Sequence, residues 1–162
     1  LNLPFPAAAV LISPWGDLTC SGESIHRNAE SDPLIPLGAL RFVAKSYSRG
    51  QDAAAPLLSP VFADYTGLPP LLIQVGSTEV LYSDAVRVAD QAERAGVEHT
   101  LQVWEQMPHV FHALAAWLPE ASMALREIGV FVNARLGHSD EAAHVRARAQ
   151  IAGGNSWRSA KG

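Results

Sequence analysis

Three short apolar runs alternate with helical patterns along this chain, and this alternation limits its possible folds more than any other feature. The runs are expected to be strands at 7–13, 71–75 and 99–104, and the helical patterns cover about 36–46, 83–95 and 119–135. The first run is apolar throughout, which is typical of a strand buried on both faces of a parallel sheet. The order therefore predicts an α/β fold with mainly parallel strands, right-handed crossovers and flanking helices.

The sheet predicted by these runs is incomplete. Three strands are few for such a fold, because the first would expose a long unpaired edge. The chain also starts at Leu1 and enters an apolar run within a few residues, which is abrupt for a whole protein. Residues 138–162 lose apolar periodicity and include Gly153 and Gly154, so we expect a flexible tail behind one domain that spans 1–137.

Composition excludes several classes of protein. The 162 residues carry a net charge of −4 without a basic run, so nucleic acid is not an expected partner. The single cysteine, Cys20, cannot form an internal disulfide, which favours a reducing compartment. We find neither a membrane-spanning stretch nor a signal-peptide pattern, and therefore expect a cytoplasmic protein. The spacing of His26, His99, His138 and His144 does not predict a metal site.

Two polar residues follow neighbouring strands at the end where a parallel sheet places its functional side chains. Glu79 comes after the second predicted strand, and His109 comes after the third. Because carboxyl ends of parallel strands meet at one edge, these side chains are expected to lie together. An imidazole titrates near neutral pH and can transfer protons when a carboxylate holds its tautomer. Asp84 is a competing acid, although a position at a helix N-terminus explains it adequately.

Four segments carry a resemblance to a known family. They are 13–19 (SPWGDLT), 59–62 (SPVF), 67–77 (GLPPLLIQVGS) and 107–112 (MPHVFH). In this order and spacing, across residues 5–136, the chain resembles the C-terminal half of the bacterial hormone-sensitive-lipase-like esterases. The resemblance implies the C-terminal portion of an α/β-hydrolase fold. It also implies cleavage of carboxylic esters, usually with short to medium acyl chains, without metal or cofactor.

The same resemblance implies roles for individual residues. His109 matches the family's catalytic histidine, and Glu79 matches its catalytic acid, which is more often Asp. The family's His-Gly-Gly oxyanion segment and its Gly-Asp-Ser-Ala-Gly nucleophile elbow belong upstream and are absent from this sequence. Ser24 and Ser77 lack the flanking glycines of such an elbow. We therefore expect a Ser-acid-His carboxylesterase of which this chain supplies the acid and the histidine, with little catalysis by the chain alone.

The expected partners follow from this interpretation. They are a small-molecule ester, an N-terminal half that carries the nucleophile and, by resemblance, a second copy paired through the last strand at 100–104. Two alternatives stay open: a non-catalytic domain that serves binding or assembly, and an acyltransferase that shares the triad but differs in its acceptor. His112 is expected to be a packing or solvent-facing residue rather than a catalytic one, and Asp17 is expected to hold its loop by hydrogen bonds.

Overall fold

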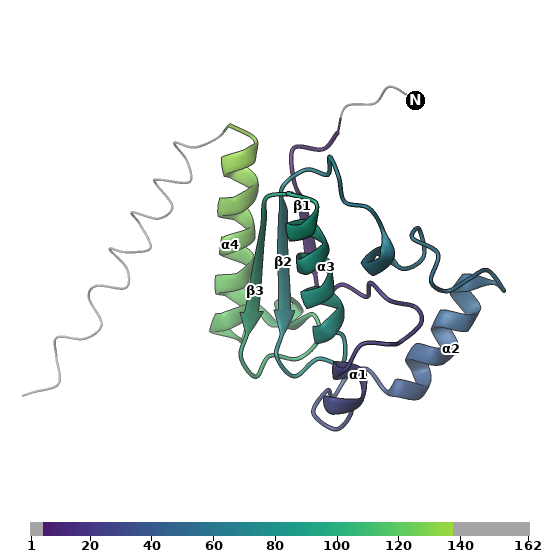
Figure 1. Ribbon diagram of the computed structural model, residues 1–162. Helices are drawn as coiled ribbons and strands as arrows, with labels where there is room; N and C mark the ends of the chain where they lie inside the picture. The colour runs from purple at the N-terminus through teal and green to yellow at the C-terminus, as the bar shows by residue number, and fades with distance from the viewer. Residues whose placement is uncertain (1–4, 138–162) are drawn as a thin grey trace, which may run out of the picture.

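A three-stranded parallel sheet forms the centre of the molecule. The structure is a computed structural model that describes residues 5–137, so the tail expected at 138–162 lies outside the described residues. The strands β1 (Ala9–Ile12), β2 (Leu71–Gly76) and β3 (His99–Trp104) are paired in the order β1-β2-β3. Figure 1 shows helices flanking this sheet. The predicted α/β class with parallel strands in an unclosed sheet is confirmed.

The central strand β2 explains why helices cover both faces of the sheet. Every residue of β2 is buried, and successive side chains of a strand point to opposite faces. Leu71, Ile73 and Val75 pack in one apolar cluster with α3 (Tyr82–Arg94). Gln74 faces the other way, and its Nε2 donates a hydrogen bond of 3.1 Å to the Ala124 carbonyl on α4 (Pro119–Arg135).

The helix boundaries agree with the sequence patterns to within one or two residues. Helix α4 has the predicted bounds, and α3 begins at Tyr82, one residue before the predicted start. Ser83 thus lies in the first turn of α3, and its Oγ accepts a hydrogen bond from the Ser24 backbone N–H. Gly96 follows the end of α3 with φ of 68°, where a glycine costs little strain.

The first strand differs from the prediction. β1 is shorter than the apolar run 7–13, and its residues are half-buried or exposed rather than enclosed on both faces. The physical reason is its position at the edge of the sheet: among the described residues, only β2 pairs with it. The residues of β1 are all apolar, but the rest of the described chain buries them only partly.

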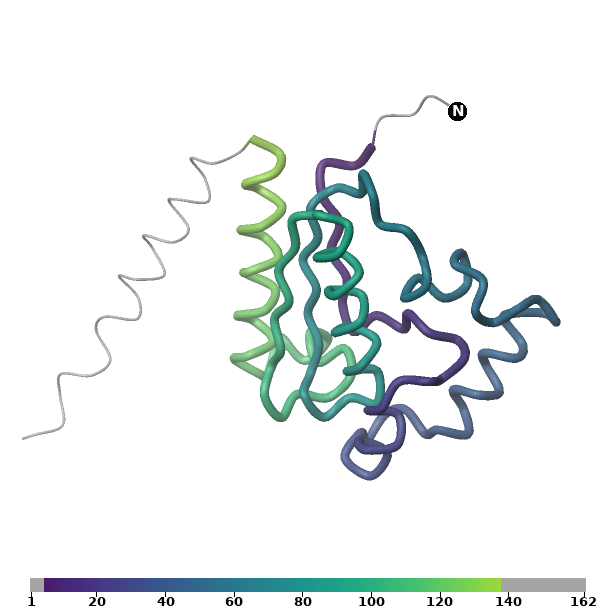
Figure 2. Tube along the Cα trace, in the orientation of Figure 1, coloured from purple at the N-terminus to yellow at the C-terminus, as the bar shows by residue number. Residues whose placement is uncertain are grey.

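The segment between β1 and β2 carries two helices and a 3₁₀ turn. Helix α1 (Ser24–Arg27) and the turn Pro60–Phe62 have no counterpart in the sequence prediction, whereas α2 (Leu37–Ser48) matches its predicted region. Figure 2 shows the chain leaving β1, turning outward and returning beside the start of α3 before it enters α1. No helix between residues 5 and 137 combines the length and the apolar character that a membrane crossing requires.

Candidate active site

Glu79 and His109 meet beyond the carboxyl ends of β2 and β3. The Nδ1 atom of His109 lies 3.0 Å from Oε2 of Glu79. The side chain of Glu79 is completely enclosed, whereas that of His109 is 24% exposed. The structure thus brings together the acid and the base that the sequence places at neighbouring strand ends. A buried acid behind a partly exposed imidazole is the arrangement that a proton-transfer site requires.

The contacts of the Glu79 carboxylate determine the tautomer of His109. Its Oε1 atom accepts hydrogen bonds from the Ser13 hydroxyl at 2.8 Å and from the Gly76 N–H at 2.5 Å. A carboxylate has no proton to donate, so the ring of His109 donates from Nδ1. This leaves Nε2 to accept a proton, and the structure gives that atom no hydrogen-bond partner among the described residues.

The loop that carries Glu79 is held by side chains of residues that follow α1. Asn28 donates two hydrogen bonds from Nδ2, to the carbonyl oxygens of Ser77 at 3.1 Å and of Glu79 at 2.8 Å. Oδ2 of Asp32 accepts the Val80 N–H at 2.9 Å. Because both sides of Glu79 are fixed through the backbone, the direction of its side chain is set by distant parts of the sequence.

Asp84, the competing acid, serves another part of the structure. Its Oδ2 atom accepts the backbone N–H groups of Gly16 at 3.0 Å and Asp17 at 2.9 Å, and its Oδ1 atom is buried without a hydrogen-bond partner. Burial, and then the charge of Asp17, raise the pKa of Asp84 to about 7. Asp84 thus anchors the loop after β1 and forms no hydrogen bond with His109.

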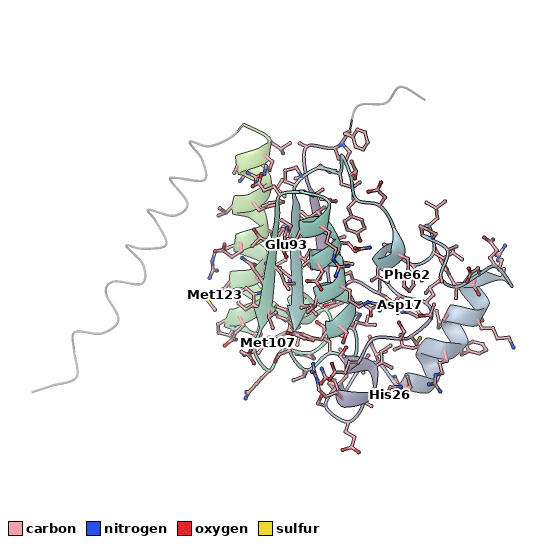
Figure 3. All side chains as sticks on the ribbon, in the orientation of Figure 1. Asp17, His26, Phe62, Glu93, Met107 and Met123 are labelled. Carbon is pink, nitrogen blue, oxygen red and sulfur yellow. The ribbon has the colours of Figure 1, made fainter. Side chains whose placement is uncertain are left out.

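Asp17 organises the loop in which it lies. Burial by itself would raise the pKa of Asp17, but hydrogen bonds from Ser21, Thr19 and Arg87 outweigh it and lower the pKa to about 2. The Arg87 guanidinium on α3 lies 2.7 Å from its Oδ2 atom. Figure 3 shows Asp17 beside α3. The loop-holding role that the sequence suggested for Asp17 agrees with these contacts.

The other candidate side chains do not join the Glu79–His109 pair. His112 is buried, its Nε2 lies 2.7 Å from Oε1 of Gln74, and burial lowers its pKa, as suits a packing residue. The Ser24 hydroxyl donates to the Val80 carbonyl, and the Ser77 hydroxyl accepts the Gln106 N–H. Within the part of the chain that the structure describes, no three His, Cys, Asp or Glu side chains are grouped as metal ligands would be.

Sequence reasoning missed Ser13 and Asn28 as parts of this site. Ser13 follows β1 directly, so the strand-end rule that singled out Glu79 and His109 also applied to it. Asn28 gave no signal, because its partners lie 49 and 51 residues away in the sequence.

Comparison with known proteins gives consistent matches. A family model described as the alpha/beta hydrolase fold matches residues 1–113. An acetyl-hydrolase from Streptomyces hygroscopicus is 45% identical over 134 residues, which are 83% of this chain and 45% of that protein. An esterase from Acinetobacter venetianus is 39% identical over 127 residues, covering 78% of this chain and 42% of that protein.

A crystal structure of an esterase from the bacterial hormone-sensitive lipase family aligns with a TM-score of 0.81. The two sequences are 43% identical, and the aligned residues make up 83% of this chain and 45% of the esterase chain. The chain thus spans less than half the length of these relatives. The matched residues 1–113 include both Glu79 and His109. On the match to the family model, this chain belongs to the alpha/beta hydrolase family.

Proposed function

We propose that the protein carrying this chain hydrolyses carboxylic esters through a serine–acid–histidine triad, with His109 as the proton-transfer group and Glu79 as the acid that orients it. The observation that supports this most directly is the 3.0 Å contact between His109 Nδ1 and the enclosed Glu79 carboxylate. Esterases and an acetyl-hydrolase among the relatives support the same reaction class.

Each proposed step moves one proton through His109. A serine hydroxyl attacks the ester carbonyl carbon and gives its proton to Nε2, and the imidazolium then returns this proton to the departing alcohol. Water then attacks the acyl carbonyl carbon and gives a proton to Nε2, the imidazolium returns this proton to the departing serine oxygen, and the carboxylic acid is released. Throughout, Glu79 accepts the hydrogen bond from the Nδ1–H group and stabilises the transient positive charge on the ring.

The nucleophile and the oxyanion donors of this proposal come from residues outside this sequence. No Gly-x-Ser-x-Gly motif occurs in the 162 residues. We therefore propose that the 162-residue chain has little activity by itself. We also propose that a second copy of the protein pairs through the outer edge of β3, which has no partner strand among the described residues. We further propose a cytoplasmic location, which the single cysteine supports.

Hydrolysis of p-nitrophenyl butyrate tests the proposal. The complete protein that contains this sequence should release p-nitrophenol, and His109→Ala should lower kcat by about 1000-fold or more. His99→Ala is the matched control, because His99 lies on β3 and its ring forms a hydrogen bond through Nδ1 with the Val97 carbonyl rather than with Glu79. Activity that survives His109→Ala would contradict the proposed role.

The 162-residue chain should be assayed beside the complete protein, with its intact mass measured on the same sample. Turnover by this chain that depends on His109 would place a nucleophile within it and overturn the proposed division of the triad. Transfer of the butyryl group to an added alcohol in preference to water would identify an acyltransferase. Ligand binding without any turnover would favour a binding or assembly role.

A further inference from the structure

Ser13 occupies a strained and buried position where β1 ends. Its φ angle is 47°, in the left-handed region that residues other than glycine rarely adopt. Its backbone N–H donates a hydrogen bond of 2.7 Å to the Gln74 carbonyl on β2, and its side chain is buried. Strained residues persist where surrounding contacts fix them, and they concentrate at functional sites.

The Ser13 hydroxyl joins the two loops that carry Glu79 and His109. It donates to Oε1 of Glu79 at 2.8 Å and accepts the backbone N–H of Val110 at 3.1 Å. Val110 directly follows His109 and has φ of 50°, an unfavourable conformation for a β-branched residue. One hydroxyl therefore holds the acid and the strained backbone next to the base.

We propose that Ser13 is a positioning residue that couples the Glu79 carboxylate to the His109 loop, an inference that rests on the proposed function. Its hydroxyl lies on the carboxylate side of the pair, and its proton is directed at Glu79 rather than at His109. This geometry makes it unsuited to be the nucleophile, which must approach Nε2. It is suited to fixing the direction of the Nδ1 contact.

The coupling has a simple physical consequence. Without the hydroxyl, the Val110 N–H loses its partner and the left-handed conformation at Val110 loses a restraint. The loop is then free to relax and carry the imidazole away from Glu79. A displacement of about 1 Å in a catalytic group is sufficient to lower a rate about 100-fold.

Ser13→Ala in the complete protein tests this on turnover. We expect kcat to fall about 10- to 100-fold while KM changes less than about twofold, because positioning acts on the chemical step. Ser13→Thr keeps the hydroxyl but places a β-branched side chain at a positive φ, so it should recover only part of the loss.

The matched control is Ser59→Ala. Ser59 is also fully buried, and its hydroxyl also makes two hydrogen bonds, to the Ala53 carbonyl at 2.6 Å and from the Leu18 N–H at 2.7 Å. It contacts neither Glu79 nor His109. A fall in kcat for Ser13→Ala no larger than that for Ser59→Ala would overturn the proposal.

A second measurement does not depend on activity. The Nδ1 proton of a histidine bonded to a carboxylate resonates far downfield in the proton NMR spectrum, and we expect the His109 signal to shift or broaden in Ser13→Ala but not in Ser59→Ala. An unchanged signal would overturn the role of Ser13 even if His109 proves essential. Conversely, a lost signal in a protein without ester hydrolysis would support the coupling and reject the proposed function.

If Ser13→Ala does not fold, Ser13→Cys gives the same two readouts. A thiol is a weaker donor than a hydroxyl, so kcat and the downfield signal should change in the same direction by a smaller amount. Wild-type values for both readouts in Ser13→Cys would overturn the proposal.

Discussion

The carboxylate of Glu79 is held by protein groups at both of its oxygens. It is fully enclosed, and its two oxygens meet donors from Ser13, Gly76 and His109. A buried acid whose oxygens face donors keeps its geometry without water, and its replacement leaves those donors without partners. The contacts of the pair therefore depend on the charge of this side chain as well as on its shape.

Glu79→Gln separates charge from shape. The amide keeps the size of the side chain, but an NH₂ group facing His109 Nδ1 would favour the wrong tautomer. We expect kcat for p-nitrophenyl butyrate to fall at least about 100-fold in the complete protein, and Glu79→Asp to retain more activity. Glu93→Gln, an exposed change on α3, serves as the control. Wild-type turnover by Glu79→Gln would rule out the orienting role.

Asp84 should make stability depend on pH. Its pKa is raised from 3.8 to about 7, so the folded state binds a proton more tightly than the unfolded state. The stability that it contributes is complete below pH 3.8 and is lost as the pH rises through about 7. Asp17 acts in the opposite direction and at lower pH: with its pKa lowered to about 2, its contribution is present above pH 3.8 and disappears on acidification.

Urea unfolding of Asp84→Asn at pH 5 and pH 8 measures this effect. We expect the wild type to lose more stability than the variant between these two values, with a difference of about 3 kcal/mol at most, because only the two pH units between pH 5 and the raised pKa contribute. Asp90→Asn, an exposed change on the same helix, should retain the wild-type pH dependence. Parallel curves for the wild type and Asp84→Asn would show that Asp84 is not responsible.

At the scale of elements, the site depends on loops that approach each other at the end of the sheet. The chain after β3 passes so close to the end of β2 that a Cβ atom at Gly76 would overlap the Met107 carbonyl. Met107 lies near this end of the sheet in Figure 3, and Thr78 Oγ1 donates to the same carbonyl at 2.8 Å. The absence of a side chain at Gly76 therefore allows the Glu79 and His109 loops to meet.

Gly76→Ala should disrupt this approach. We expect a loss of about 2 kcal/mol or more in the free energy of unfolding, because the overlap is with backbone that cannot move aside cheaply. Gly129→Ala is the opposite control: Gly129 lies exposed in α4 with open space around it, so alanine should add about 0.5–1 kcal/mol. Urea denaturation compares the two, and equal stabilities would refute the close-approach argument.

For the whole molecule, the main structural feature is the outer edge of β1, which has no partner strand among the described residues. Ala9 donates its N–H to the Pro70 carbonyl just before β2 and Ser13 donates to Gln74 on β2, so by alternation the N–H groups of Val10 and Ile12 point away from β2. An apolar hollow of about 570 Å³ runs along the same strand, with Leu11, Trp15 and Tyr65 in its wall. This face has the character of an interior surface, which agrees with a chain that spans less than half of its relatives.

Amide hydrogen exchange at Val10 and Ile12 tests this interpretation. In the 162-residue chain alone, both amides should exchange rapidly, because they face no acceptor among the described residues. In the complete protein, we expect strong protection of both from a neighbouring strand. The Ile73 amide on β2 should be protected in the 162-residue chain as well, which provides the internal reference. Equally fast exchange of Val10 and Ile12 in both samples would mean that β1 is a true edge.

The sequence by itself determined the class of fold and the order of its main elements. Apolar periodicity is a local property, so it located the strands near Leu71 and His99 and helices α3 and α4 to within a few residues. It also placed Glu79 and His109 at neighbouring strand ends, because parallel topology brings those ends to one edge. What it could not provide was the length and burial of β1, which depend on what lies beside that strand.

The tertiary structure alone decided how the acid is held. The hydroxyl of Ser13 reaches Glu79 across 66 residues and the Val110 N–H across 97, and Asn28 binds carbonyls about 50 residues away. No local pattern encodes such contacts, since they arise only when separate loops converge at one end of the sheet. Which of the two acids, Glu79 or Asp84, forms a hydrogen bond with His109 was also decided by the tertiary structure. Both acids follow β2, but only the former is directed toward the imidazole.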